Sequence, residues 1–256
     1  MVEKKPSDLI ESVSRAFRIL EKLGDSPGGL SAKQVSRRCG IALPTTYHLL
    51  RTLCYERYVV RRPEGTYLLG LEIASRFREL VASMQRPPNI HELLRHLTEV
   101  TGHTAAFAQI IDGRVVITDS VEGPHSPHLE DLVVGFDEGA HATAFGKALL
   151  STMPPPARHA LLREQGLRPF TPRTIVDPEQ LDHELQAQAR RRMFGEQGQY
   201  RDEVGCVAVL VGGDQPGALG MSAGLERWQA VSSLLARQLR LTAADLTHKT
   251  AGQSGR

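Results

Sequence analysis

The chain has 256 residues, of which 41% are hydrophobic and 23% are charged, and its formal net charge at pH 7 is +2. The longest nearly unbroken apolar run, Val204–Val211, is far shorter than the roughly 18 to 20 residues that span a bilayer. The composition therefore excludes a membrane span and indicates a globular protein, and the length predicts two domains that each bury a core.

The N-terminal sequence and the cysteines indicate the compartment. Charged residues recur through MVEKKPSDLIESVSR, where a secretory signal would need an apolar segment. The three cysteines, Cys39, Cys54 and Cys206, share no C-x-x-C spacing, which disfavours both a disulfide framework and a thiolate zinc site. We expect a cytoplasmic protein with no membrane partner.

Positive charge is concentrated at one end of the chain. Residues 1–70 contain 12 Lys and Arg residues against 7 Asp and Glu, whereas the remaining 186 contain 19 against 22. A basic module joined to a mildly acidic one indicates a polyanionic partner for the basic module.

The first predicted elements are two helices separated by a turn. An apolar stripe at helical spacing predicts a helix over residues 12–24. Ser31 is a good N-cap for a short helix over residues 32–39, and Gly40 breaks that helix.

A third helix is predicted over residues 45–57, with Pro44 in its first turn. Polar and basic side chains occupy its outer face. Two short alternating strands follow around the turn Pro63-Glu64-Gly65. The inward face of the third helix comprises Thr46, Leu49, Leu50 and Leu53.

After a predicted linker helix over residues 71–84, the chain mixes hairpin-forming strands with helices. Asp112-Gly113-Arg114 separates two β-type runs, and two further strands precede a final helix from about Glu226 to Leu246. This mixture predicts an α+β domain with an antiparallel sheet covered by helices. The predicted organisation is a first domain over residues 1–70, a linker helix within 71–88, a second domain over 89–248 and a disordered tail over 249–256.

A helix, a short break and a second helix form the arrangement in which the second helix enters the major groove of DNA. Polar side chains at the start of the third helix suit base edges, and Arg51, one turn further along, suits a phosphate or a guanine. Arginines on the hairpin suit phosphates or the adjacent minor groove. The alternative to DNA binding is that these side chains only form the solvated surface of a three-helix bundle. The predicted contacts to a double-stranded DNA operator are Thr45, Thr46, Tyr47, His48, Arg51, Arg61 and Arg62.

Several segments are specific as an ordered set: SVSRAFRILEKL, the three helices with their hairpin and YLLG, then HATAFGKALLS, FTPRTIVDPEQLDHEL, GCVAVLV and ALGMSAG. Through this set, residues 12–240 resemble the IclR-type transcriptional regulators. The resemblance implies a winged helix-turn-helix domain, a linker helix that takes part in dimerisation, and a GAF-like α+β effector-binding domain. The implied function is a ligand-responsive repressor that works as a homodimer or homotetramer, without catalysis and without a cofactor.

The resemblance also implies where an effector binds. The matching positions are Ala144, Phe145, Glu196, Cys206, Met221 and Ala223. Relatives that bind small acids carry hydroxyl side chains at the last two positions, which lie two residues apart on one strand and so face the same way. Because this chain has Met221 and Ala223 there, and a bulky Phe145, we predict an effector more apolar than a two- or three-carbon oxoacid, such as an aromatic molecule. The alternative is that Phe145 and Met221 fill the cavity.

Two other classes of function stay open at this stage. One is an enzyme with Cys206 as nucleophile and a histidine as base, although an apolar strand pattern is more typical of a buried, inert cysteine. The other is a metal sensor, because His125 and His128, followed by Glu130 and Asp131, supply enough donors for zinc or manganese.

Overall fold

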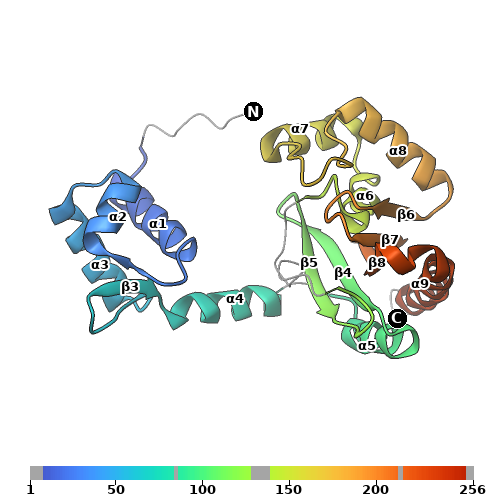
Figure 1. Cartoon of the computed structure of the whole chain (residues 1–256), viewed down its shortest axis with the longest axis horizontal. Helices are drawn as coiled ribbons and strands as arrows, with labels where there is room; N and C mark the ends of the chain where they lie inside the picture. The colour runs from blue at the N-terminus through green and yellow to red at the C-terminus, as the bar shows by residue number, and fades with distance from the viewer. Residues whose placement is uncertain (1–7, 84–85, 128–138, 213–215, 252–256) are drawn as a thin grey trace. The chain divides into compact units, whose positions relative to one another are not determined.

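The computed structural model describes residues 8–83, 86–127, 139–212 and 216–251 (Figure 1). The chain divides into two compact units, one that ends at residue 84 and one that begins at residue 85. Among the described residues, no helix is both long enough and apolar enough to cross a membrane.

The N-terminal unit contains three packed helices, a small sheet and one further helix. Its elements are α1 (Glu11–Gly24), β1 (Leu30–Ser31), α2 (Ala32–Cys39), α3 (Leu43–Tyr55), β2 (Val59–Arg61), β3 (Thr66–Leu69) and α4 (Leu71–Ser83).

Local capping sets the ends of α2 and α3. The Ser31 hydroxyl accepts the Gln34 N–H at 3.4 Å, and the Gln34 side chain accepts the Ser31 N–H at 2.8 Å, which forms a capping box. Gly40 ends α2 with a φ of 65°, in the left-handed region that favours glycine. Pro44 lies in the first turn of α3. These start and stop signals are confirmed as the sequence predicted them.

The core of this unit lies between its helices and the hairpin. Ile19 of α1, Val35 of α2 and Leu50 of α3 are fully buried in one cluster. The predicted hairpin is the antiparallel pair β2–β3, and β1 adds a strand on the other side of β3. The sequence did not indicate β1, because two residues are too few to show alternation.

The C-terminal unit is a five-stranded antiparallel sheet between two layers of helices. Its elements are α5 (Ile90–Thr101), β4 (Thr104–Ile111), β5 (Arg114–Val121), α6 (Ala144–Leu150), α7 (Pro155–Gln165), α8 (Pro178–Arg190), β6 (Phe194–Gln197), β7 (Val204–Val211), β8 (Gly217–Gly224), the 3-10 turn η1 (Leu225–Arg227) and α9 (Trp228–Ala251).

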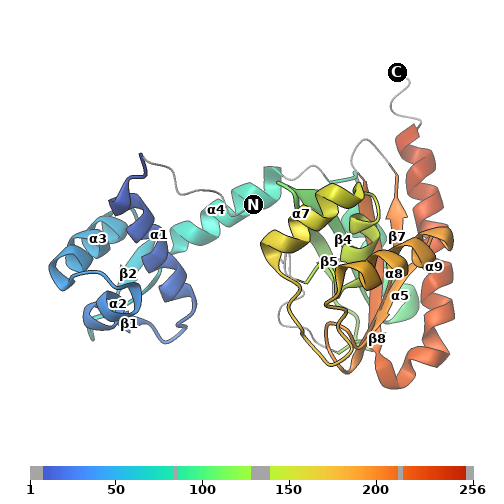
Figure 2. The ribbon, with the colours of Figure 1, turned by 90° about the horizontal axis from the view of Figure 1, so that it is seen from above.

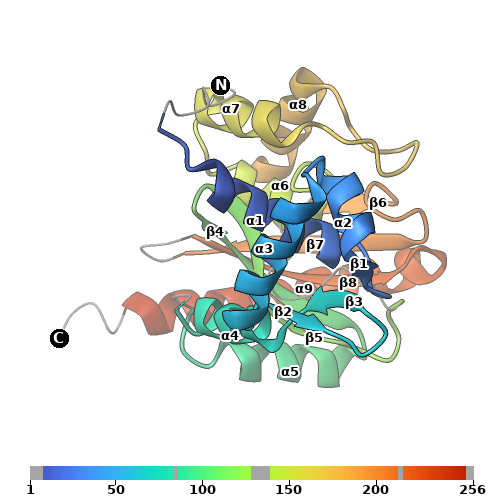
Figure 3. The same cartoon turned by 90° about the vertical axis from the view of Figure 1, so that its left-hand side faces the viewer.

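The strand order is β5-β4-β8-β7-β6, and every neighbouring pair is antiparallel. Helices α6, α7 and α8 cover one face of this sheet, and α5 and α9 cover the other (Figures 2 and 3). This confirms the predicted α+β class with helices over an antiparallel sheet.

Two elements differ from the sequence-based expectation. β6 was not predicted, because the residues FGEQ show no run of strand-forming side chains, and the strand forms by pairing with β7. The sequence predicted a disordered tail over residues 249–256, but helix α9 continues to Ala251, so the prediction is wrong for residues 249–251. Residues 252–256 lie outside the described part of the chain.

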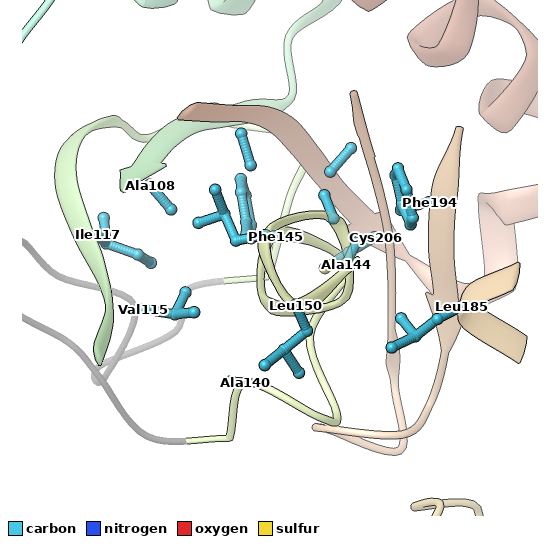
Figure 4. Packing of buried hydrophobic residues seen from close by; sticks show 14 of the residues in the cluster. Ala108, Val115, Ile117, Ala140, Ala144, Phe145, Leu150, Leu185, Phe194 and Cys206 are labelled. Carbon is cyan, nitrogen blue, oxygen red and sulfur yellow. The ribbon is translucent and has the colours of Figure 1, made fainter. Parts of the chain in front are cut away.

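Helix α6 lies flat against the sheet, and all of its residues are buried (Figure 4). Gly146 lets the turn before α6 pack closely on the helix. A β-carbon at position 146 would lie 2.0 Å from the carbonyl oxygen of Ala140, which is part of the backbone and cannot rotate away. The glycine therefore fixes how closely the turn before α6 folds onto the helix.

We predict that Gly146→Ala destabilises the C-terminal unit by about 2 to 3 kcal/mol, because the new methyl group forces the backbone apart. Gly224→Ala is the matched control. Gly224 is also buried, but its β-carbon would make only ordinary contacts of 3.7 Å or more, and its φ of −60° suits alanine. Urea unfolding followed by fluorescence of Trp228, the single tryptophan of the chain, measures both variants. Equal midpoints for the two variants would contradict the prediction.

Candidate functional site

The predicted DNA-reading side chains lie on α3 and on the β2–β3 hairpin. Tyr47, His48 and Arg51 are exposed on α3, and Thr45 is half-buried. The hydroxyl of Thr46, by contrast, donates to the carbonyl of Ala42 at 3.1 Å, and its side chain is fully buried. The prediction that Thr46 contacts DNA is therefore wrong, whereas its assignment to the inward face of the helix is confirmed.

The hairpin presents two exposed arginines. The guanidinium of Arg61 lies over the ring of the buried Tyr67, 5.9 Å from its centroid, which orients an otherwise flexible side chain. The guanidinium of Arg62 lies 3.9 Å from the exposed carboxylate of Glu64, a separation at which an exposed ion pair contributes little. Both cations therefore stay available at the surface beside the turn.

In the C-terminal unit, four predicted effector-site residues meet where α6 packs on the sheet. Glu196 on β6 is the direct antiparallel partner of Cys206 on β7, so the two side chains point to the same face of the sheet. Ala144 and Phe145 lie in the α6 layer over that face, in the same buried cluster as Cys206 (Figure 4). The structure thus brings together four of the predicted residues.

The other two predicted residues, Met221 and Ala223, lie on the opposite face of the sheet. Both belong to the core between the sheet and helices α5 and α9. The residue between them, Ser222, is the direct partner of Cys206 and therefore faces α6. The prediction that Met221 and Ala223 line the effector site is wrong. Side chains along β8 point alternately to the two faces of the sheet, and the prediction assigned these faces one residue out of register.

This correction changes the chemistry of the site. On β8, the hydroxyl of Ser222 faces α6, whereas the sequence analysis had placed the apolar side chains of Met221 and Ala223 there. These two residues therefore give no support to an apolar effector. Phe145 packs directly on the backbone of Gly220, where a β-carbon would lie 2.5 Å from the ring. Phe145 therefore fills the space over Gly220 and borders the polar residues rather than replacing them.

Glu196, Cys206 and Ser222 form a buried polar row across three strands, which we call the polar row. The Oε2 atom of Glu196 accepts the N–H of Gln199 at 2.7 Å. The Oε1 atom of Glu196 and the hydroxyl of Ser222 have no hydrogen-bond partner among the described residues. Burial raises the pKa of Glu196 to about 7, chiefly because desolvation disfavours the carboxylate.

Lys147 is the cation nearest to the polar row. It is fully buried in α6, and its ammonium group donates to the carboxylate of Glu184 on α8 and to the side-chain oxygen of Gln199. Burial lowers the pKa of Lys147, and the contact with Glu184 opposes that shift. This contact ties α6 to α8 and to the turn after β6.

The structure also bears on the two alternative functions. Burial raises the pKa of the Cys206 thiol well above its ordinary value, which disfavours the thiolate that a nucleophile needs. The ring of His125 lies 5.8 Å from that of His103, and His128, Glu130 and Asp131 lie outside the described residues. Within the residues that the structure describes, no group of three or more His, Cys, Asp or Glu side chains is arranged to hold a metal ion.

Two family profiles match the chain. Residues 12–63 match the IclR helix-turn-helix domain, and residues 81–248 match the profile described as bacterial transcriptional regulator IclR C-terminal. These matches confirm the resemblance read from the ordered motifs.

Similar proteins agree with the profiles. The HTH-type transcriptional regulator XynR of Escherichia coli K12 is 31% identical over 206 residues, which cover 79% of this chain and 81% of that protein. The transcriptional repressor IclR of the same strain is 27% identical over 188 residues, covering 72% and 68%. A crystal structure of an IclR homologue from Microbacterium hydrocarbonoxydans, complexed with 4-hydroxybenzoate, superposes with a TM-score of 0.72 at 19% identity over 94% of this chain and 99% of that one. This last likeness shows the fold alone.

The raised pKa of Glu196 predicts a pH-dependent stability. A group whose pKa is raised from 4.5 in the unfolded chain to about 7 in the fold stabilises the fold most below pH 4.5, and this contribution is lost as the pH rises through 7. Glu196→Gln removes the titration. We expect the free energy of unfolding of the wild type, relative to that of the variant, to fall by about 2 to 3 kcal/mol between pH 5 and pH 9.

Urea unfolding at half-unit pH intervals measures this difference. Glu179→Gln, the same substitution at an exposed position of α8, is the control and should follow the wild-type profile. A wild-type profile parallel to that of Glu196→Gln would show that Glu196 does not titrate in this range.

Proposed function

This chain belongs to the IclR family of transcriptional regulators. We propose that it is a repressor that binds its operator as a homo-oligomer, and that a small organic effector raises or lowers its affinity for the operator. The observation that carries the DNA-binding part is the division of α3 into two faces. Thr46, Leu50 and Leu53 are buried, whereas Tyr47, His48 and Arg51 are exposed. A recognition helix needs this division, because one side must pack on its own domain while the other enters the groove.

In this proposal the exposed groups have different roles. Thr45, Tyr47 and His48, near the start of α3, contact base edges, and Arg51 contacts a phosphate or a guanine. Arg61 and Arg62 hold the neighbouring phosphates or enter the minor groove beside them. Base contacts set the sequence preference, whereas phosphate contacts set position and account for most of the salt dependence.

Helix α4 supports self-association. No side chain of α4 is buried within the described part of the chain, although the helix carries three large apolar residues at exposed positions. An amphipathic helix is stable in water when its apolar face is covered, and a second copy of the same helix offers a complementary face. A dimer presents two α3 helices and so requires an inverted repeat with half-sites about one helical turn apart, or a multiple of that spacing. The three residues are Leu71, Phe77 and Leu80; Phe77 and Leu80 lie on one side of the helix, and Leu71 lies on the other.

The effector site is proposed at the polar row, with Ala144 and Phe145 of α6 above it. Buried polar atoms without partners beside an aromatic ring suit a small organic molecule with one polar end and one apolar part. The homologue solved with 4-hydroxybenzoate supports a ligand of this kind. The name of the E. coli repressor supports repression as the outcome. The effector controls the operator by binding more tightly to one of two arrangements of the oligomer, and DNA selects between the same arrangements.

Arg51→Ala and Arg62→Ala test the DNA contacts. If each arginine contacts one phosphate, each variant should bind the operator more weakly and lower the slope of log K against log salt by roughly one unit. Fluorescence anisotropy with duplexes from the region upstream of its own gene, across a salt series, measures both quantities. Arg163→Ala, at an exposed position of α7 in the other unit, removes the same charge and should change neither. Unchanged slopes in the two test variants would remove these arginines from the interface.

Leu80→Glu tests the role of α4. Because the side chain is exposed within the chain, the substitution should leave the fold intact and weaken self-association by about tenfold or more, through loss of a covered apolar contact. Arg78→Glu introduces the same residue at another exposed position of α4 and should have a smaller effect. Sedimentation equilibrium over a range of concentrations compares the two. Equal dissociation constants would place the interface elsewhere.

A further inference from the structure

The polar row contains two buried oxygen atoms that no described residue hydrogen-bonds. The Oε1 atom of Glu196 and the hydroxyl oxygen of Ser222 lack a hydrogen-bond partner among the described residues, and the two residues are only 4% and 1% exposed. The great majority of buried polar atoms in proteins are hydrogen-bonded. Two exceptions in one row of one sheet point to a binding site for a small molecule.

The two atoms lie on either side of Cys206. Neighbouring strands lie about 4.8 Å apart, so the backbones of Glu196 on β6 and Ser222 on β8 are separated by about 10 Å. Both side chains point to the α6 face, with the thiol between them. A polar group of a few atoms over Cys206 can therefore contact both residues at once.

The charges around Glu196 leave its carboxyl group poised between two protonation states. Lys147 faces it from α6, but that ammonium group already bonds Glu184 of α8. The neutral thiol of Cys206 donates to the carboxyl group from β7, and Gln199 and Tyr200 supply backbone N–H groups from the turn after β6. With burial opposing ionisation, the pKa of about 7 means that both forms of Glu196 are populated near neutral pH.

The two forms suit different ligands. Protonated Glu196 offers an O–H donor, and with the Ser222 hydroxyl it makes a pair of donors that one carboxylate can accept. Ionised Glu196 would instead place a second negative charge next to the carboxylate, in a buried site where like charges repel strongly. An amine would have the opposite preference.

We propose that the polar row binds an effector carboxylate only when Glu196 is protonated, so that binding takes up one proton from solvent wherever Glu196 of the free protein is ionised. This inference rests on the proposed function, which places the effector at the same site. Below about pH 6 the dissociation constant should be constant, and above about pH 8 it should rise roughly tenfold per pH unit, as expected when one proton is linked to binding.

Three probes of similar shape and different charge test this inference: benzoate, benzyl alcohol and benzylamine. Each is titrated into the full-length protein by calorimetry from pH 6 to pH 9, in two buffers with different ionisation enthalpies, so that the protons exchanged per ligand are counted. At pH 8 we expect benzoate binding to take up close to one proton. Glu196→Gln, whose amide mimics the protonated carboxyl group, should bind benzoate with no proton uptake and no pH dependence.

Two further variants serve as controls. Ser222→Ala should weaken benzoate binding and keep the proton uptake, because it removes only one donor. Glu179→Gln, exposed on α8, should behave as the wild type. Thermal melting of each variant checks that the fold is kept.

The outcomes separate the inference from the proposed function. Benzoate binding without proton uptake, proton uptake that persists in Glu196→Gln, or binding of benzylamine without any binding of benzoate would each overturn the inference and leave an effector site in place. If none of the three probes binds and none changes the affinity for operator DNA, the effector site and the inference both fail.

Discussion

The C-terminal unit depends on the close packing of α6 against one face of its sheet. Two glycines shape this layer: Gly220 leaves room on the sheet for the ring of Phe145, and Gly146 lets the turn before α6 pack on the helix through the Ala140 carbonyl. With α6 seated in this way, every second residue of β6, β7 and β8 lies beneath it. The position of the helix therefore decides which residues belong to the candidate effector site and which belong to the other core.

Buried charge gives this layer its specificity. Lys147 is paired with Glu184 and Gln199, so α6, α8 and the turn after β6 are held by one ammonium group. Removing one partner of such a pair leaves an uncompensated buried charge, which is far more costly than the net contribution of the pair itself. Glu196 lies close by and is bonded at only one oxygen. The same layer thus contains one ionic contact that joins the helices and one buried carboxyl group with an oxygen that no described residue hydrogen-bonds.

The sequence predicted those features that depend on local chemistry. The cap at Ser31, the stop at Gly40 and the inward face of α3 follow from interactions between residues close in the chain, and the structure confirms them. The phase of β8 could not be read in this way. All residues of GALGMSAG are buried, so polarity does not alternate along the strand, and only the pairing of Cys206 with Ser222 shows which residues face α6. The sequence also could not show that one oxygen of Glu196 and the hydroxyl of Ser222 lack partners among the described residues, because this depends on which donors the neighbouring strands and α6 bring close to them.

The two-sided burial of β8 also bears on how a bound effector influences the rest of the protein. Ser222 faces the candidate site, whereas its neighbours Met221 and Ala223 pack in the same core as Ile90 and Leu94 of α5. Helix α5 is the first element of the C-terminal unit, and it follows in the chain after α4, the helix proposed for self-association. Because successive residues of a strand move together, a shift of β8 toward a ligand at Ser222 must be absorbed by the packing of α5 on the other face. The core packed on both sides of β8 thus joins the candidate effector site to α5, the element that follows the linker, without a change in the strand order of the sheet.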